Sequence, residues 1–478
     1  MGPMTIRLKT RARRSSIVVV SLVALAAGVH AQVLPNGDAG IGAGIGEPNN
    51  ATLGPAARAP LLTYGVDAGI GESDNVTLVA TDKISQTIAT ADVDFAVKEQ
   101  SRLLDVTAKG DFSYFDYLQN AYSSQLLGRF DGIGNVTLVP ERLIWVVRDD
   151  FGQAALDPFT PVTPTNLEDI NYFSTGPDLT MRFGGINFID VSARYARAQY
   201  ETSPFNSNRL LGSVAVGRDM SAGSTVSLNA DTERVMFENT VLNTDFDRTS
   251  VFGRYELHGA RTDFVGDLGA TMINQAGVST SGALAKVQLS RKVSSAAKLI
   301  LSAGRDLTDG AASFSTQQAG ASGINLTTPA ALTSDSYTRT YASAGWQYVR
   351  HRTTLALTAG WEKDTYASQP SLDVTRPGAE FNIERQLTHA FSARLVGRWY
   401  KTDYPHAVVA AAVGSSNFED GMVGAALTWR HGRGLEIRMR YDHDSHVVSS
   451  GSGGFGENRV FLTIGYRPRL TPELQEPL

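Results

Sequence analysis

Residues that could bind a metal gather in one short segment near the C-terminal end of the chain. The segment reads Asp442-His443-Asp444-Ser445-His446, and imidazole and carboxylate groups are good ligands for divalent metals. It lies directly before a Gly/Ser-rich stretch, residues 449–456, whose composition is typical of a solvated loop. The sequence therefore favours an exposed loop over a metal site, and it predicts no cofactor.

Motifs that mark common catalytic centres are absent from the sequence. It contains no Gly-x-Ser-x-Gly, no His-Glu-x-x-His and no phosphate-binding loop that ends in Gly-Lys-Ser or Gly-Lys-Thr. The glycine-rich stretch at residues 40–46 follows no strand pattern and is interpreted as a linker. The sequence therefore predicts a protein that is not an enzyme.

Charged residues elsewhere alternate with apolar ones at every second position. In residues 435–442, for example, Leu, Ile, Met and Tyr alternate with Glu, Arg, Arg and Asp. This period of two is that of a β-strand with one apolar face and one polar face. About twenty such segments follow one another from Leu61 onwards.

The connections between these segments alternate between short turns and long loops. Short turns include residues 184–187, 258–261 and 431–434, whereas long loops include 150–169, 306–335, 402–419 and 443–458. Alternating connections predict an all-β fold, namely a transmembrane up-and-down antiparallel β-barrel of about 18–20 strands, with long loops outside the cell. A soluble sandwich, β-helix or propeller is the alternative, but strands of about 10–14 residues exceed the usual globular length and suit a tilted membrane-spanning strand.

If the apolar side chains face lipid, the charged ones face the lumen. The pore-lining candidates are Arg194, Arg254, Lys286, Arg394, Arg398, Arg438, Arg440, Asp231, Glu233 and Glu380. Arg394 and Arg398 with Arg438 and Arg440 could form a basic patch that attracts carboxylate or sulfate groups. The alternative is a structural ladder of opposite charges along the wall.

Aromatic residues near the ends of the segments suggest girdles at the two membrane surfaces, because amphipathic rings prefer the headgroup level. Ordinary β-propensity would also place aromatic residues in strands. The candidates are Tyr114, Tyr117, Trp145, Phe173, Tyr200, Phe237, Trp346, Trp361, Trp399, Tyr400, Trp429 and Tyr466.

The two ends of the chain differ from the middle. Residues 1–31 have a basic start, an apolar run from Ile17 to Val29 and a Val-His-Ala cleavage pattern, which together predict a secretory signal peptide. Residues 32–60 are interpreted as a flexible periplasmic leader, 61–468 as the barrel and 469–478 as a C-terminal tail.

Composition narrows the class of protein further. Removing Arg7, Lys9, Arg11, Arg13 and Arg14 with the signal peptide takes the formal charge from −5 to −10, which argues against a nucleic-acid partner. The chain has no cysteine, so an exported product must be stabilised without disulfides.

Two stretches carry a resemblance to a known family. They are residues 64–76, Tyr-Gly-Val-Asp-Ala-Gly-Ile-Gly-Glu-Ser-Asp-Asn-Val, and residues 101–117, which begin Ser-Arg-Leu-Leu-Asp-Val. With the hairpins that follow, the chain from about Leu62 to Arg467 resembles the β-barrel porins encoded in bacterial exopolysaccharide gene clusters, the EpsL-like group. The resemblance implies an outer-membrane channel for polysaccharide export, with periplasmic and inner-membrane export machinery as partners. It carries over no catalytic residue.

One feature departs from such barrels, because the last aromatic residue, Tyr466, is followed by a proline-containing tail instead of ending the chain. Three functions stay open at this point. The first is an export porin for exopolysaccharide, and the second is a general or solute-specific uptake porin. The third is a barrel whose loops serve adhesion or enzymatic work. Some outer-membrane barrels are hydrolases with a Ser/His pair on the lipid-facing surface, and that chemistry needs the nucleophile within hydrogen-bond reach of its base.

Overall fold

The computed structural model describes residues 61–318, 333–407, 416–449 and 453–468. The predicted signal peptide, periplasmic leader and C-terminal tail lie outside these residues. The described residues form twenty β-strands and three short helices. No helix among them is both long enough and apolar enough to cross a bilayer.

The strands are 12 to 17 residues long. They are β1 (Leu61–Ser73), β2 (Gln86–Gln100), β3 (Leu104–Tyr117), β4 (Gln125–Val139), β5 (Leu143–Ala155), β6 (Leu167–Phe183), β7 (Asn187–Tyr200), β8 (Ser207–Ser221), β9 (Ser224–Phe237), β10 (Phe246–His258), β11 (Thr262–Gln275), β12 (Val278–Lys292), β13 (Ala297–Asp309), β14 (Ser336–Arg350), β15 (Thr353–Tyr366), β16 (Val374–Gln386), β17 (Phe391–Asp403), β18 (Asn417–His431), β19 (Leu435–Val448) and β20 (Phe455–Tyr466). The helices are η1 (Pro164–Asn166), α1 (Gly310–Gln318) and η2 (Pro370–Leu372).

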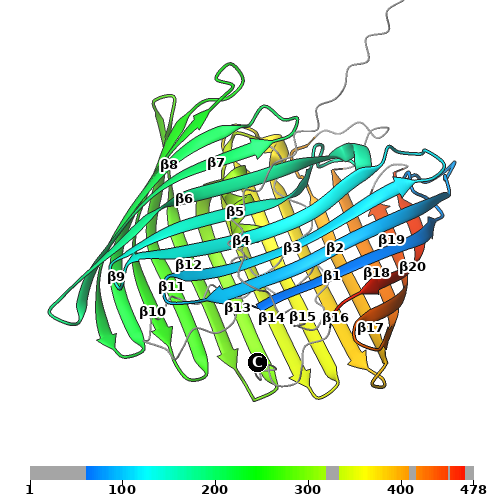
Figure 1. Ribbon diagram of the computed structural model, residues 1–478. Helices are drawn as coiled ribbons and strands as arrows, with labels where there is room; N and C mark the ends of the chain where they lie inside the picture. Colours follow the sequence, from blue (N-terminus) through cyan, green and yellow to red (C-terminus); the bar gives the residue numbers. More distant parts are fainter. Residues whose placement is uncertain (1–60, 319–332, 408–415, 450–452, 469–478) are drawn as a thin grey trace, which may run out of the picture. The chain divides into compact units, whose positions relative to one another are not determined.

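Each strand pairs antiparallel with its neighbours in the chain, and the sheet closes on itself where β1 pairs with β20 (Figure 1). The closing register runs from Val66 opposite Tyr466 to Ser73 opposite Arg459. Closure leaves no unpaired strand edge, and it satisfies the backbone groups that a bilayer cannot. The predicted all-β, up-and-down antiparallel barrel is confirmed, at the upper end of the predicted strand number.

The connections after odd-numbered strands lie at one rim, the loop rim, and those after even-numbered strands lie at the other, the turn rim. One connection at the loop rim is short, contrary to the prediction of long loops throughout. It is Ala276-Gly277 between β11 and β12, and both residues have positive φ, 52° and 80°. Such a two-residue turn matches the twist of its strands and favours Gly at the second position.

Several strands continue further towards the loop rim than the sequence predicted. The strand β5 reaches Ala155, and β19 reaches Val448, so the loops predicted at residues 150–169 and 443–458 are shorter. The segment 442–446 therefore lies within β19 and is not part of an exposed loop. Strand pairing overrides the loop-like composition because β18 and β20 flank these residues on both sides.

Candidate functional site

The outer surface of the barrel is apolar and exposed. Leu268 on β11 is 74% exposed and Leu228 on β9 is 62% exposed, and many apolar side chains share their side of the sheet. Water-soluble monomers rarely expose so many large apolar side chains on one side of a sheet. It is the surface of a barrel that lies in a membrane.

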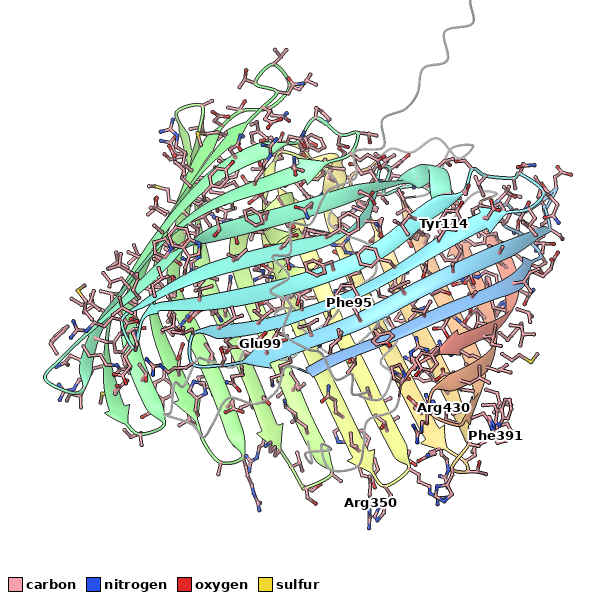
Figure 2. The ribbon with its side chains drawn as sticks, viewed as in Figure 1. Phe95, Glu99, Tyr114, Arg350, Phe391 and Arg430 are labelled. Carbon is pink, nitrogen blue, oxygen red and sulfur yellow. The ribbon has the colours of Figure 1, made fainter. Side chains whose placement is uncertain are left out.

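Aromatic residues lie on both sides of the wall, not only at the membrane surfaces. Tyr114, shown with Phe95 on the front strands in Figure 2, is exposed, as are Trp145, Trp346 and Trp399. Three other members of the predicted girdles are buried instead, namely Tyr117, Tyr200 and Phe237. For these three the girdle interpretation is wrong, because each shares its side of the strand with inward-facing residues.

All ten pore-lining candidates lie on the inner side of the wall, by the alternation of exposed and buried residues along their strands. Most of them have a carboxylate or guanidinium partner. Arg194 contacts Asp178 at 2.6 Å, and Arg254 makes two bonds to Asp267, at 2.7 and 2.9 Å. Whether these residues conduct ions stays a prediction.

Lys286 is joined to Asp306 at 2.7 Å, and Asp231 and Glu380 also face inward. Glu380 stands opposite Arg398 in the register of β16 and β17. Opposite charges therefore alternate along this wall, which keeps the inner surface polar.

The four arginines proposed as a basic patch lie on β17 and β19, which β18 separates. Arg438 contacts Glu436 at 2.7 Å, and Arg440 contacts Asp442 at 2.7 Å. Arg398 lies 3.7 Å from Asp444. Their partners favour the alternative interpretation, a ladder of opposite charges, over a free basic patch.

Two inner clusters combine charges that sequence reasoning did not group. In the first, Arg209 on β8 forms ion pairs with Glu233 on β9, at 3.0 Å, and with Asp309 at the end of β13, at 2.5 Å. Arg248 on β10 forms a further ion pair with Glu233. Arg209, Glu233 and Asp309 are buried. Because charges in such surroundings need partners, this cluster fixes the relative positions of four strands.

The second inner cluster lies on three consecutive strands. Arg339 on β14 bonds Glu362 on β15, and Arg376 on β16 bonds both Glu362, at 2.6 Å, and Asp364, at 2.8 Å. All four side chains are buried. The period of two places them inward, but only the register between strands shows that they meet.

Helix α1 follows β13 and lies against the inner face of strands on the far side of the barrel. Phe314 and Ala311 of α1 pack against Tyr172 on β6 and Ala198 on β7. Since β13 and β6 are seven strands apart, this contact crosses the lumen. The sequence left open whether the loop at 306–335 folds inward, and for its described residues the structure answers that it does.

Polar contacts hold α1 in this position from both sides. Arg148 on β5 donates to the carbonyl oxygen of Ser315 at 2.7 Å. On the opposite wall, the hydroxyl of Tyr337 on β14 lies 2.7 Å from that of Ser313. The helix therefore bridges two opposed walls and obstructs part of the lumen.

A second bridge joins two loops of the loop rim. Phe159, between β5 and η1, packs edge-on against Tyr404, which follows β17, with ring centroids 4.7 Å apart. Val374 and Phe418 belong to the same apolar cluster. Burial raises the pKa of Tyr404 to about 12, so its phenol stays neutral in this apolar contact.

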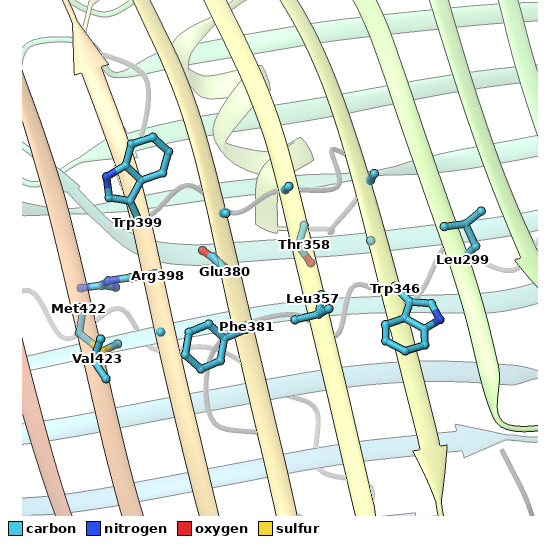
Figure 3. Close-up of a pocket in the computed structure, with 15 residues that line it drawn as sticks. Leu299, Trp346, Leu357, Thr358, Glu380, Phe381, Arg398, Trp399, Met422 and Val423 are labelled. Atoms are coloured by element: carbon cyan, nitrogen blue, oxygen red, sulfur yellow. The ribbon is translucent and has the colours of Figure 1, made fainter.

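The outer surface carries a hollow of about 500 Å³ over strands β13–β18 (Figure 3). Its lining includes Trp346, Leu357, Phe381, Trp399 and Val423, which belong to the outward-facing side. Gly397 stands opposite Phe381 and leaves room for its ring. Most of its lining is apolar and outward-facing, and the inward-facing Glu380 and Arg398 also contribute to it.

No family model matches the chain, and no curated protein matches it. Similar solved structures include the FrpB iron transporter from Neisseria meningitidis, F5-1 variant, with 10% identity, a TM-score of 0.43, and coverage of 85% of this chain and 82% of that one. A ferric enterobactin receptor (PfeA) mutant from Pseudomonas aeruginosa has 10% identity, a TM-score of 0.42, and coverage of 85% and 80%. The copper transporter OprC has 10% identity, a TM-score of 0.40, and coverage of 85% and 80%.

The histidines of β19 do not build a metal centre. Among the residues that the structure describes, no three His, Asp or Glu side chains are placed to hold a metal ion. His446 faces inward and its Nδ1 lies 2.7 Å from Oδ1 of Asp420, whereas His443 faces outward, next to Asn458 on β20. Alternation along the strand separates the two imidazoles by the thickness of the wall.

Proposed function

We propose that the protein is a bacterial outer-membrane channel through which a polar solute or polymer crosses, with an exopolysaccharide leaving the cell as its cargo. One observation carries the channel: a closed barrel whose outer surface is apolar and whose inner wall carries charges of both signs. Barrels of this width enclose an aqueous interior. The proposed cargo rests on the resemblance of residues 62–467 to the EpsL-like porins of exopolysaccharide gene clusters, described under Sequence analysis.

The inner wall suits a hydrated polymer chemically. Arginines such as Arg440, which is 47% exposed on its side chain, offer donors to hydroxyl and carboxylate groups. The bridges made by α1 and by Phe159 with Tyr404 lie on the path of the cargo. Passage therefore depends on how far these two bridges move aside. Periplasmic and inner-membrane export machinery would deliver the polymer at the turn rim.

Conductance of the purified protein in planar lipid bilayers tests the channel. We expect discrete steps of current with the folded protein and none with the denatured protein, which is the control. A folded barrel, shown by a change in its migration on a gel after boiling, that never conducts under any voltage or salt would contradict a channel.

A clean deletion of the gene tests the cargo. We expect surface polymer to disappear while its synthesis continues, so that polymer accumulates inside the cell. Restoration of export by the wild-type gene is the control. Normal surface polymer in the deletion strain would exclude the export role.

The α1 bridge also favours a second candidate, a solute-specific uptake porin, because an inward-folded helix selects by size. Liposome swelling separates the two functions. Rapid entry of monosaccharides, together with normal surface polymer in the deletion strain, would establish uptake.

A further inference from the structure

Asn458 on β20 joins an imidazole to a carboxylate on the outer side of the barrel. Its Oδ1 lies 2.9 Å from Nδ1 of His443, which stands opposite it on β19. Its Nδ2 donates to Oδ2 of Asp74 at 2.6 Å, and its backbone N–H donates to Oδ1 of the same carboxylate at 2.7 Å. The three residues form a chain that runs across the closing seam of the barrel.

The carboxylate determines which nitrogen of His443 carries a proton. Burial tends to raise the pKa of Asp74, but the hydrogen bonds from Asn458 outweigh it and lower the pKa, so this group is ionised at neutral pH. A carboxylate only accepts, so the amide of Asn458 must point its NH₂ at Asp74 and its oxygen at His443. Nδ1 of His443 therefore carries the proton, and Nε2 keeps a free lone pair, as a general base requires.

A hydroxyl lies two residues from this base on the same side of β19. Ser445 has a glycine opposite it on each neighbouring strand, Gly421 on β18 and Gly456 on β20. No side chain from these two positions covers its hydroxyl. Oγ of Ser445 donates a long hydrogen bond, 3.3 Å, to the carbonyl oxygen of Gly421. For catalysis the side chain of Ser445 must rotate so that its hydroxyl points towards Nε2 of His443.

The apolar hollow of the outer surface begins next to these residues. Val423 stands opposite His443, and Trp399 stands opposite Gly421 in the register. Both line the hollow of about 500 Å³ that continues over β13–β18 (Figure 3). A site with a nucleophile at one end and an apolar hollow beside it fits an ester of a long acyl chain.

We infer that Ser445, His443 and Asn458 form an acyl-ester hydrolase site on the lipid-facing surface, with a membrane phospholipid as substrate and the hollow as the site of its acyl chain. This activity lies outside the proposed transport function and contradicts the prediction of a non-enzyme. Ser445 and His443 are its catalytic residues, and Asn458 and Asp74 are positioning residues.

The reaction has two steps. Oγ of Ser445 attacks the ester carbonyl carbon, its proton passes to Nε2 of His443, and the ester C–O bond breaks as the alcohol leaves with that proton. Water then attacks the acyl-serine, gives its proton to Nε2, and releases the fatty acid as Ser445 regains a proton. The products are a fatty acid and a lysophospholipid, and no oxidant or cofactor is consumed.

Covalent labelling and lipid hydrolysis test this site in the full-length folded protein. We expect a fluorophosphonate probe to label Ser445, identified by mass spectrometry, and fatty acid to be released from palmitoyl-oleoyl phosphatidylethanolamine in mixed micelles. Ser445→Ala should abolish labelling at this position and the hydrolysis that depends on it, and His443→Ala should reduce both signals by about 100-fold or more, the usual contribution of a general base. Ser281→Ala, on an exposed residue of β12, is the matched control.

The positioning role of Asn458 is tested separately. Asn458→Ala should slow labelling at least about tenfold, and Asn458→Gln, which keeps an amide able to accept from Nδ1 and to donate to Asp74, should recover part of it. Each variant must still show the change in gel migration on boiling that marks a folded barrel, and Ser445→Ala should leave the conductance unchanged. Wild-type protein that is folded but neither labelled at Ser445 nor hydrolytic overturns the inference, and so does a Ser445→Ala variant with full activity.

Discussion

The guanidinium of Arg209 on β8 lies 2.5 Å from the carboxylate of Asp309 at the end of β13, so one buried ion pair connects walls five strands apart. Both side chains are almost completely buried. The pair therefore stabilises the folded barrel only as long as both charges are present.

Arg209→Met should strongly destabilise the barrel, because it leaves the buried carboxylates of Asp309 and Glu233 with less compensation. The expected loss in the free energy of unfolding is about 3–5 kcal/mol, measured by urea titration in detergent micelles. Arg182→Gln, which breaks the exposed pair with Asp219, is the control and should cost about 0–1 kcal/mol. Equal losses in the two variants would show that the Arg209 pair is not buried in the folded protein.

Phe314→Asp should release α1 from the inner wall and raise the single-channel conductance. The substitution places a charge against the apolar side chains of Tyr172 and Ala198, which disfavours the bridge. Thr316→Asp adds the same charge on an exposed position of the helix and should leave conductance unchanged. Identical conductance in both variants would mean that α1 does not restrict the path.

A pair of cysteines at 159 and 404 should cross-link the two loops of the second bridge. The reason is the contact of Phe159 with Tyr404, and the absence of any native cysteine removes background reaction. We expect a short bifunctional maleimide to join Phe159→Cys with Tyr404→Cys, visible after proteolysis between the two sites. The pair Phe159→Cys with Val241→Cys, where Val241 is 91% exposed on the loop between β9 and β10, should stay unlinked.

Arg438→Glu combined with Arg440→Glu should shift the channel towards cation selectivity. Arg440 should contribute most, because its side chain is 47% exposed whereas that of Arg438 is 15% exposed beside Glu436. The reversal potential in a salt gradient is the measurement, with Arg218→Glu as the control. Arg218 is exposed on the outward-facing side of β8, so its reversal should have no effect. An unchanged reversal potential in the double variant would place both arginines off the ion path.

The sequence alone determined the strands and the barrel. Alternating side chains such as Leu435, Ile437 and Met439 against Glu436 and Arg438 impose a strand with two unlike faces, whatever its partners. Connections of alternating length then predict an up-and-down order of strands. In a membrane, the backbone groups at the two edges of such a sheet find partners only when the sheet closes into a barrel. The prediction of aromatic girdles was wrong for residues such as Tyr117 and Tyr200, because nearness to a strand end does not determine which side of the wall a residue faces.

Tertiary structure decided every contact between segments far apart in the chain. Asp74 and Asn458 are 384 residues apart, and they meet only because β1 and β20 close the barrel in one register. Likewise, Phe314 reaches Tyr172 only because the curvature of twenty strands brings opposite walls within the length of a short helix. A period of two fixes the side on which a residue lies, but register and closure determine its neighbours, because each strand can slide against the next without altering its own pattern.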